Sequence, residues 1–268
     1  MRPFEGDRRV YLILDSHLLR TDSANALLKS LEEPPAYAVF VLVSDHAQRM
    51  LPTIRSRVTA IPFRRLSSEQ LAAHTGDPVA ARAAMGDVTR AERLASDPES
   101  AERRRQYLSL ARGSLVDAGF DPAEAARLIT DAAAARSAQA QRQVEQDGAA
   151  QLEGVEDSRQ RKALEKRIDE RAKRTARRAQ LEEVREAVDV VGLWYRDLMA
   201  TSLGAEGAVI NSDAAGELAK DAKLGSPADA ARAVAIVSEA RRSLELNVQP
   251  ALAVEAMFHR LRLVPAGR

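Results

Sequence analysis

The chain has 268 residues, which is long enough for two or three domains and a sizeable core. It has no cysteine, so disulfides, thiolate zinc sites and cysteine catalysis are excluded. Its 40 basic and 39 acidic residues nearly cancel, and any attraction to DNA therefore has to come from a local patch. No apolar run approaches the roughly 20 residues of a membrane span, and the first residues lack the apolar core of a signal peptide. We therefore expect a cytoplasmic protein with no membrane partner.

The amino-terminal segment carries the only α/β pattern in the chain. Arg9–Leu14 and Ala38–Val43 are apolar runs typical of strands buried on both faces of a parallel sheet, and Val58–Phe63 predicts a third, shorter strand. Ser23 is the expected N-cap of a helix between the first two strands, and a proline pair beginning at Pro34 stops that helix. Three strands with one or two helices cannot close a doubly wound domain, so we expect this sheet to need neighbouring strands that the chain lacks.

From Leu66 onward the sequence predicts helices only. The segment from Ser67 to Gln70 is typical of a helix N-terminus. Two Gly-Asp pairs, at 76–77 and 86–87, then separate three short helices that end near Leu94. A further helix is expected over residues 98–118. After Val184 the pattern becomes strongly amphipathic, and two last helices are expected over Pro227–Leu244 and Pro250–Leu263, with a turn at 247–250 between them.

Between these helical regions lies a charged stretch, Ala132–Gln180, for which we expect one long exposed helix. Basic residues outnumber acidic ones in Ser158–Arg178, and Leu164, Ile168 and Ala172 supply only a thin apolar seam. The basic side chains could bind DNA phosphates, each contact adding salt-dependent affinity. The interleaved acids and the lack of aromatic residues for base stacking favour a solvated helix face instead. A coiled-coil scaffold is a weaker third alternative.

Two sequence motifs in the α/β segment resemble those of a known family. Residues 24–35 read Ala-Asn-Ala-Leu-Leu-Lys-Ser-Leu-Glu-Glu-Pro-Pro, and residues 52–57 read Pro-Thr-Ile-Arg-Ser-Arg. With the surrounding order of strand, helix, strand and loop, they resemble the second half of the nucleotide-binding domain of bacterial DNA polymerase III clamp-loader subunits, which are AAA+ ATPases.

This resemblance implies a mostly α fold in four parts. They are the C-terminal half of an AAA+ (RecA-like) α/β domain without its N-terminal phosphate-loop half, a three-helix lid, a helical region with the long charged insertion, and a helical collar domain for oligomerisation. The expected boundaries are 1–65, 66–97, 98–183 and 184–268.

The elements that would bind and hydrolyse ATP are degraded. A phosphate-binding loop needs a Gly-Lys dipeptide, and the chain contains none. Asp15 stands at the strand end where the family supports magnesium, but Ser16 replaces the glutamate that polarises the attacking water. Ser44 takes the position of the family's sensor 1, where it would contact a phosphate or simply cap a turn. Asp15 and Ser44 are therefore weak cofactor-binding candidates, and a structural role is the favoured interpretation of Asp15.

Two further residues near these elements carry weaker expectations. The lid arginine (sensor 2) is displaced, because Thr89 takes its usual position and Arg90 comes one residue later, rotated by roughly 100° along the helix. For His17 we expect a packing role rather than metal binding, since no second His, Asp or Glu stands at metal spacing near it in the sequence. No metal site is expected.

One functional element of the family is intact. Arg57 ends the Ser-Arg pair that, by the resemblance, projects an arginine finger in trans onto the γ-phosphate of ATP-Mg bound by a neighbouring subunit. A guanidinium is permanently charged and can meet two phosphate oxygens at once. The alternatives are that Arg57 is an ordinary surface arginine or that Arg55 is the finger.

A chain with an arginine finger and degraded ATP chemistry resembles the delta-prime type of clamp-loader subunit. The resemblance implies a non-hydrolysing subunit that supports loading of the sliding clamp in DNA replication, with no catalysis and no cofactor of its own. Its expected partners are gamma/tau and delta subunits in a hetero-oligomeric ring, with the clamp and primed DNA reached through the complex, as part of the DNA-directed DNA polymerase (nucleotidyltransferase) holoenzyme. The alternative is an ATP-hydrolysing gamma/tau-type subunit or another AAA+ ATPase fragment.

Overall fold

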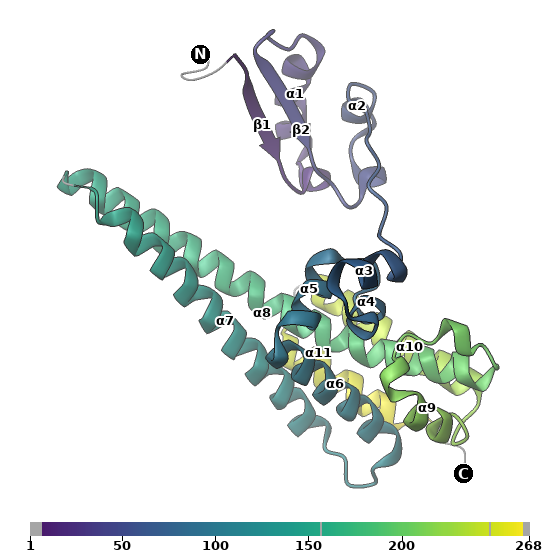
Figure 1. The fold of residues 1–268 in the computed structure, drawn as a ribbon. Coiled ribbons are helices and arrows are strands. Elements are labelled where there is room, and N and C mark those ends of the chain that lie inside the picture. Colours follow the sequence, from purple (N-terminus) through teal and green to yellow (C-terminus); the bar gives the residue numbers. More distant parts are fainter. Residues whose placement is uncertain (1–6, 156, 247, 265–268) are drawn as a thin grey trace. The chain divides into compact units, whose positions relative to one another are not determined.

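The computed structural model describes residues 7–155, 157–246 and 248–264, and it confirms a mostly α fold with a small α/β segment. The chain divides into two compact units, Met1–Arg64 and Arg65–Arg268, and Figure 1 labels their helices and strands. None of the helices in the described part of the chain combines the length and the apolar composition of a membrane span.

The first unit is built on a two-stranded parallel sheet. Strands β1 (Arg9–Ile13) and β2 (Ala38–Leu42) pair in register from Arg9 opposite Ala38 to Ile13 opposite Leu42, which confirms the two expected strands. Helix α1 (Thr21–Glu32) connects them and ends just before the proline pair, as predicted. The N-cap position is Arg20, so the prediction of Ser23 as the cap is wrong, and Ser23 lies within the first turn.

The sheet has one covered face. The leucines of α1 pack with Met50 and with Ile54 of the short helix α2 (Pro52–Arg55) to form its core. Val10 and Leu12 on β1 remain 62% and 60% exposed, so the prediction of a strand buried on both faces is wrong for the described residues. The third strand is also wrong, because residues 58–63 pair with no other strand in the structure and Phe63 is 95% exposed.

The second unit begins with the three short helices that the sequence predicts. They are α3 (Ser68–Thr75), α4 (Pro78–Ala83) and α5 (Val88–Ser96). Ser67 and Gln70 form a reciprocal capping box at the start of α3, and Gly76 ends that helix with a φ of 74°, a conformation that glycine adopts without strain. The side chains of Asp77 and Asp87 cap α4 and α5.

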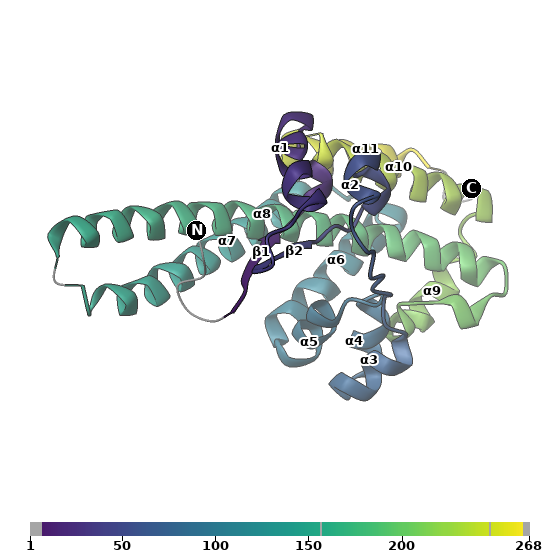
Figure 2. The same cartoon turned by 90° about the horizontal axis from the view of Figure 1, so that it is seen from above.

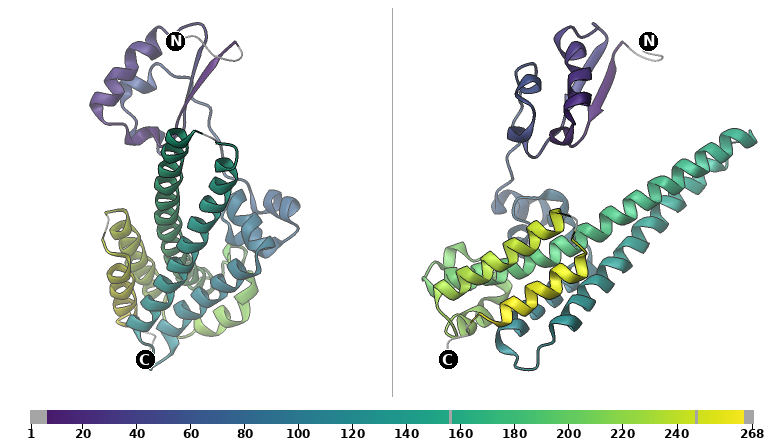
Figure 3. Two further views of the ribbon diagram at one scale, coloured as in Figure 1. Left: turned by 90° about the vertical axis from the view of Figure 1, so that its left-hand side faces the viewer. Right: turned by 180° about the vertical axis from the view of Figure 1, so that it is seen from behind.

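The remaining helices form the core of the second unit. They are α6 (Pro98–Val116), α7 (Pro122–Leu152), α8 (Ser158–Ser202), α9 (Ala215–Asp221), α10 (Pro227–Glu245) and α11 (Pro250–Arg262), seen from further directions in Figures 2 and 3. The last two helices are confirmed. Trp194 of α8 and Phe258 of α11 are among the largest fully buried side chains of this core.

The charged stretch is two helices rather than one. Helix α7 ends at Leu152, and α8 begins at Ser158 and runs back beside it, so the prediction of a single helix over 132–180 is wrong (Figure 2). Gly154 lies in the connection, and the Asp157 carboxylate accepts from the backbone N–H groups of Arg159 and Gln160 at 2.7 and 2.9 Å, which starts a new helix. Helix α8 then continues without interruption past residue 183, where a domain boundary was expected.

A buried carboxylate joins three of these helices. Glu183 of α8 is 1% exposed and accepts from the Tyr107 hydroxyl of α6 at 2.7 Å and from Arg136 Nη1 of α7 at 2.5 Å, with Arg103 Nε at 3.3 Å. Burial first, and then the nearby Glu183 charge, raises the pKa of Tyr107 far above its usual value. The phenol therefore stays protonated and serves as the donor to Glu183.

We predict that Glu183→Ala lowers the free energy of unfolding by about 3 kcal/mol, because it leaves the buried Tyr107 hydroxyl without its acceptor and removes the carboxylate that lies nearest to Arg103 and to Arg136. Thermal or urea unfolding followed by the fluorescence of Trp194, the single tryptophan, measures this effect. The matched control is Glu182→Ala, an exposed neighbour whose pair with Arg178 is worth about 0.3–0.5 kcal/mol. Equal losses in the two variants would contradict the role of Glu183.

Candidate functional site

The candidate site lies where the two parallel strands end. Asp15, Ser16 and His17 follow β1, and Ser44 and Asp45 follow β2, so both groups meet at one edge of the sheet. Ser16 is 3% exposed, and both its backbone N–H and its hydroxyl donate to the Val43 carbonyl at 2.9 Å. This serine joins the two strand ends and turns its hydroxyl away from solvent.

Asp15 and Ser44, the two residues proposed to remain from an ATP site, both shape turns. Asp15 is exposed and has a left-handed backbone with φ 50°, and its carbonyl accepts from Leu18 N at 2.8 Å. The Ser44 hydroxyl accepts from the backbone N–H of His46 at 3.1 Å and lies 3.2 Å from His17 Nδ1. These contacts are those of turn residues, and the weak cofactor-binding assignment of both stays a prediction.

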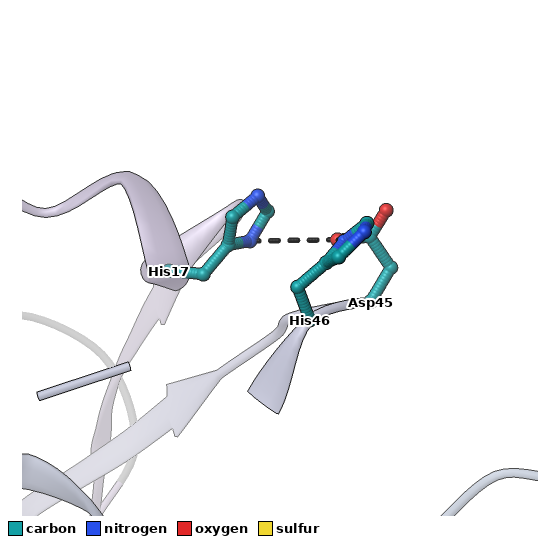
Figure 4. A group of neighbouring side chains, drawn as sticks. All are labelled: His17, Asp45 and His46. Atoms are coloured by element: carbon teal, nitrogen blue, oxygen red, sulfur yellow. Dashed lines mark ion pairs between the residues drawn. The ribbon is translucent and has the colours of Figure 1, made fainter. Parts of the chain in front are cut away.

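The strand ends also bring together a cluster that sequence reasoning missed. His17 Nδ1 lies 3.4 Å from Asp45 Oδ1, and His46 Nδ1 lies 2.7 Å from the same oxygen, as Figure 4 shows. The possible ligand atoms of His17, Asp45 and His46 all lie within 4.8 Å of one another. His17 therefore has an aspartate and a second histidine beside it in space, although none stands at metal spacing near it in the sequence. The available signal was that both groups directly follow parallel strands, whose carboxyl ends meet.

These three side chains are of the types that bind zinc, but their spacing is that of a hydrogen-bonded group. Two ligand atoms on one tetrahedral zinc lie about 3.3 Å apart, given bonds of about 2.0–2.1 Å. The 2.7 Å between His46 Nδ1 and Asp45 Oδ1 is a hydrogen-bond distance, so an ion would have to push this pair apart. The hydrogen bond with His46 lowers the pKa of Asp45. We therefore describe the cluster as a carboxylate held between two imidazoles.

Arg57, the candidate arginine finger, lies at the surface. Its side chain is 33% exposed, its Nε donates to Glu32 Oε1 at 2.7 Å, and Nη2 lies 2.5 Å from the same oxygen. Nη1 donates to the Thr53 carbonyl at 2.9 Å. Glu32 is the last residue of α1, so the guanidinium is held at the junction of α1 and α2, a contact that the sequence did not reveal. Arg55 is exposed, and its side chain makes no hydrogen bond or ion pair within the described residues.

Arg90, the displaced lid arginine, belongs to a contact between helices. It lies on α5 with its Nε 3.6 Å from Glu186 Oε1 of α8, and its side chain is 15% exposed. Arg93, one turn further along α5, pairs with the same carboxylate. Within the part of the chain that the structure describes, Nε and Nη2 of Arg90 are buried without a hydrogen-bond partner. Arg90 therefore helps to hold α5 on α8.

We predict that a carboxyl ¹³C titration by NMR finds the pKa of Asp45 below its usual 3.8, and that His46→Ala returns it toward that value. His17→Ala should have the smaller effect, because His17 acts only through its charge from farther away. Since the pKa of Asp45 is lowered in the folded protein, its contribution to stability is present above pH 4 and is lost as the pH falls through the folded value. An unchanged titration in His46→Ala would refute the hydrogen-bonded cluster.

Comparison with known proteins gives one family match and several similar relatives. The family described as "DNA polymerase III, delta subunit" matches residues 1–67. The DNA polymerase III subunit gamma/tau of Mycobacterium bovis is 41% identical over 64 residues, which are 24% of this chain and 11% of that protein. The tau subunits of Salmonella typhimurium and Escherichia coli are 38% and 36% identical over 117 residues, which are 43% of this chain and 16% of each relative.

Part of the chain is therefore similar to subunits of DNA polymerase III. The chain spans only 11–16% of the length of these curated relatives. Because the matches include both a delta-type domain and gamma/tau subunits, they do not select one subunit type.

Proposed function

We propose that this chain is a delta-prime type subunit of a DNA polymerase III clamp loader and supports the loading of the sliding clamp in DNA replication. In this role it hydrolyses no ATP and donates Arg57 in trans to ATP-Mg bound by a neighbouring subunit. The single observation that carries the proposal is the surface position of the Arg57 guanidinium, held by Glu32 at the junction of two helices.

Glu32 orients Arg57 without holding it tightly. Both side chains are substantially exposed, at 33% and 48%, and exposed ion pairs contribute only about 0–1 kcal/mol. A triphosphate carries more charge than one carboxylate, so a neighbour's γ-phosphate can replace Glu32 as the partner of the guanidinium at little cost. The bond from Nη1 to the Thr53 carbonyl would keep the arginine in place during that exchange.

Three features support the absence of ATP hydrolysis by this chain. Ser16 stands where a base would be needed, and its hydroxyl is bonded to the Val43 carbonyl. Arg90 is engaged with Glu186 rather than free to reach a phosphate. The sequence contains no Gly-Lys dipeptide for a phosphate-binding loop.

The same proposal assigns roles to the helical unit. Helices α3 to α5 would form the lid over residues 66–97, and the helices after residue 184 would form the collar that holds the subunit in a ring. Its partners would be gamma/tau and delta subunits, with the clamp and primed DNA reached through the complex. The chain would catalyse nothing alone while belonging to a DNA-directed DNA polymerase holoenzyme.

A second candidate is an ATP-hydrolysing gamma/tau-type subunit, which is favoured because the curated relatives are themselves gamma/tau and tau subunits. The two candidates differ in what the purified chain does without partners. Robust ATP turnover by the chain alone, in the presence of DNA, would favour this second candidate and defeat the first.

We predict that Arg57→Ala lowers the DNA-dependent ATPase of the reconstituted ring without dissolving it. An arginine finger raises the rate of hydrolysis at the site it serves by a factor of about 10³–10⁵. Without Arg57 that one site should be almost inactive, so the ATPase rate of the ring should fall by nearly the amount that this site supplies. Arg57→Lys should rescue little, because an ammonium lacks the planar fork. Steady-state ATPase measurements, with size-exclusion chromatography to verify assembly, test this expectation.

Two variants serve as controls. Arg55→Ala removes an exposed arginine from the same short helix and should leave turnover unchanged. Glu32→Ala frees the guanidinium and should keep or raise turnover, since the competing carboxylate is gone. Unchanged turnover in an intact Arg57→Ala ring would remove the proposed role, and a loss confined to Arg55→Ala would transfer that role to Arg55.

A further inference from the structure

The outer part of the α7–α8 hairpin carries a strongly basic helix surface. We call this part, residues 137–178, the arm, and it extends beyond the other helices of its unit (Figure 3). Within Ser158–Arg178 of α8 there are ten basic and three acidic residues, an excess of seven. All ten basic side chains are exposed, and we call them the basic face: Arg159, Arg161, Lys162, Lys166, Arg167, Arg171, Lys173, Arg174, Arg177 and Arg178.

Packing against α7 fixes which way this surface points. The apolar seam of α8 recurs every four residues at Leu164, Ile168 and Ala172, and Ala172 is fully buried. Gly148 of α7 lies so close that a Cβ there would come within 2.6 Å of Ile168 Cγ2. Because the seam is held against α7, the opposite side of α8, with most of the basic residues, is turned to solvent.

The acidic residues of the arm neutralise only part of this charge. Arg161 and Lys173 pair with Glu165 and Asp169 one turn away, and Arg178 pairs with Glu182. The other seven basic side chains make no ion pair within the described residues: Arg159, Lys162, Lys166, Arg167, Arg171, Arg174 and Arg177. The α7 side of the arm contains one basic residue, Arg142, and two acidic residues, Glu145 and Asp147, so the positive excess lies on α8.

We propose that the basic face binds the phosphate backbone of duplex DNA without sequence preference. The unpaired basic residues run from Arg159 to Arg177, which corresponds to about 27 Å of helix, and duplex DNA presents one charge per about 1.7 Å along its axis. The charge of the face therefore complements a long and regular polyanion. A hollow between α7 and α8 is lined by Lys173, Arg174 and Arg177 together with one carboxylate, Glu170, so its charged groups are mainly positive. Ser137 and Gln141 add hydrogen-bonding groups to the same hollow.

The composition of the face argues against other anionic partners. A helix that binds a membrane surface needs an apolar side to insert, but the apolar seam of α8 is packed on α7. Binding of single strands relies on aromatic side chains that stack on bases, and residues 137–178 contain no aromatic residue. The inference goes beyond the proposed function because the contact belongs to this chain alone and requires neither Arg57 nor a ring.

The test is fluorescence anisotropy of the full chain with a labelled 30-base-pair duplex of arbitrary sequence, over a range of KCl concentrations. The variant replaces Lys162, Lys166, Arg167, Arg171, Arg174 and Arg177 by Gln, which keeps the helix propensity. We expect at least a tenfold weaker affinity at 100 mM KCl. We also expect a shallower dependence of log K on log salt, by about 0.9 for each phosphate that the variant no longer neutralises.

The control removes the same charge from elsewhere in the same unit. It replaces six exposed basic residues outside the arm by Gln: Arg105, Arg127, Lys220, Lys223, Arg232 and Arg242. This variant should keep DNA affinity within about threefold, because charges within a Debye length of the DNA, and not the total charge, set binding. Circular dichroism and Trp194 fluorescence verify folding. An Arg→Lys version of the arm, which keeps its charge, should retain binding.

Three results would overturn the proposal. The arm variant could bind duplex as tightly as the parent chain, or the control variant could lose as much affinity as the arm variant. Arm-dependent binding to phosphatidylserine vesicles with none to DNA would assign the face to a membrane instead. The proposed role of Arg57 is unaffected by any of these results, since duplex binding is measured on the chain without its ring.

Discussion

The buried carboxylate of Glu183 is the interaction on which the helical unit depends. Without its partners, a carboxylate removed from water would cost several kcal/mol, so it can stay buried only while Tyr107, Arg103 and Arg136 surround it. Those partners come from α6 and α7, and Glu183 itself lies midway along α8. The three helices are therefore fixed to one another at the point where the arm leaves the packed core. One turn later, Glu186 uses the same helix to hold Arg90 and Arg93 of α5.

The polar groups at the strand ends of the first unit bond mainly to one another. The carboxyl edge of a parallel sheet is where α/β folds commonly place ligands, because several loops meet there. Here the polar groups of that edge bind one another: Ser16 bonds to Val43, Ser44 caps its own turn, and Asp45 lies between two histidines. Each group that is satisfied within the protein is one fewer group available to a nucleotide. Arg57 differs, because its partner Glu32 is exposed and exchangeable.

Local signals in the sequence were sufficient for most helices. Ser67 and Gln70, the aspartates before α4 and α5, and the proline pair after α1 act within three or four residues, so a short window contains the whole cause. The hairpin was missed because a single Gly154 in a charged stretch is a weak break, and the close fit of Gly148 on Ile168 that stabilises the paired helices is visible only in three dimensions. The third strand failed for a related reason, since an apolar run becomes a strand only where a neighbour pairs with its backbone.

The site shows the same division between local and distant causes. The position of Arg57 in the loop after the second strand was predicted from the sequence, but its ion pair with Glu32 joins residues 25 positions apart. The cluster of His17, Asp45 and His46 likewise needs the parallel pairing of β1 and β2 to exist. Such groups are set by which loops the paired strands bring together, and not by which residues are close along the chain.

The near-zero net charge of the chain conceals a separation of charge with physical consequences. The whole chain carries +1, and the segment Ser158–Arg178 alone carries an excess of seven positive charges, so the remaining residues together carry −6. At physiological ionic strength the Debye length is about 8 Å, so an approaching polyanion senses the local charge and not the sum. Residues 1–64 carry +2, so the negative excess belongs to the helical unit, whose residues outside this segment together carry −8. Within that unit the remaining surface repels DNA while the basic face attracts it, which restricts the orientations in which the two can meet.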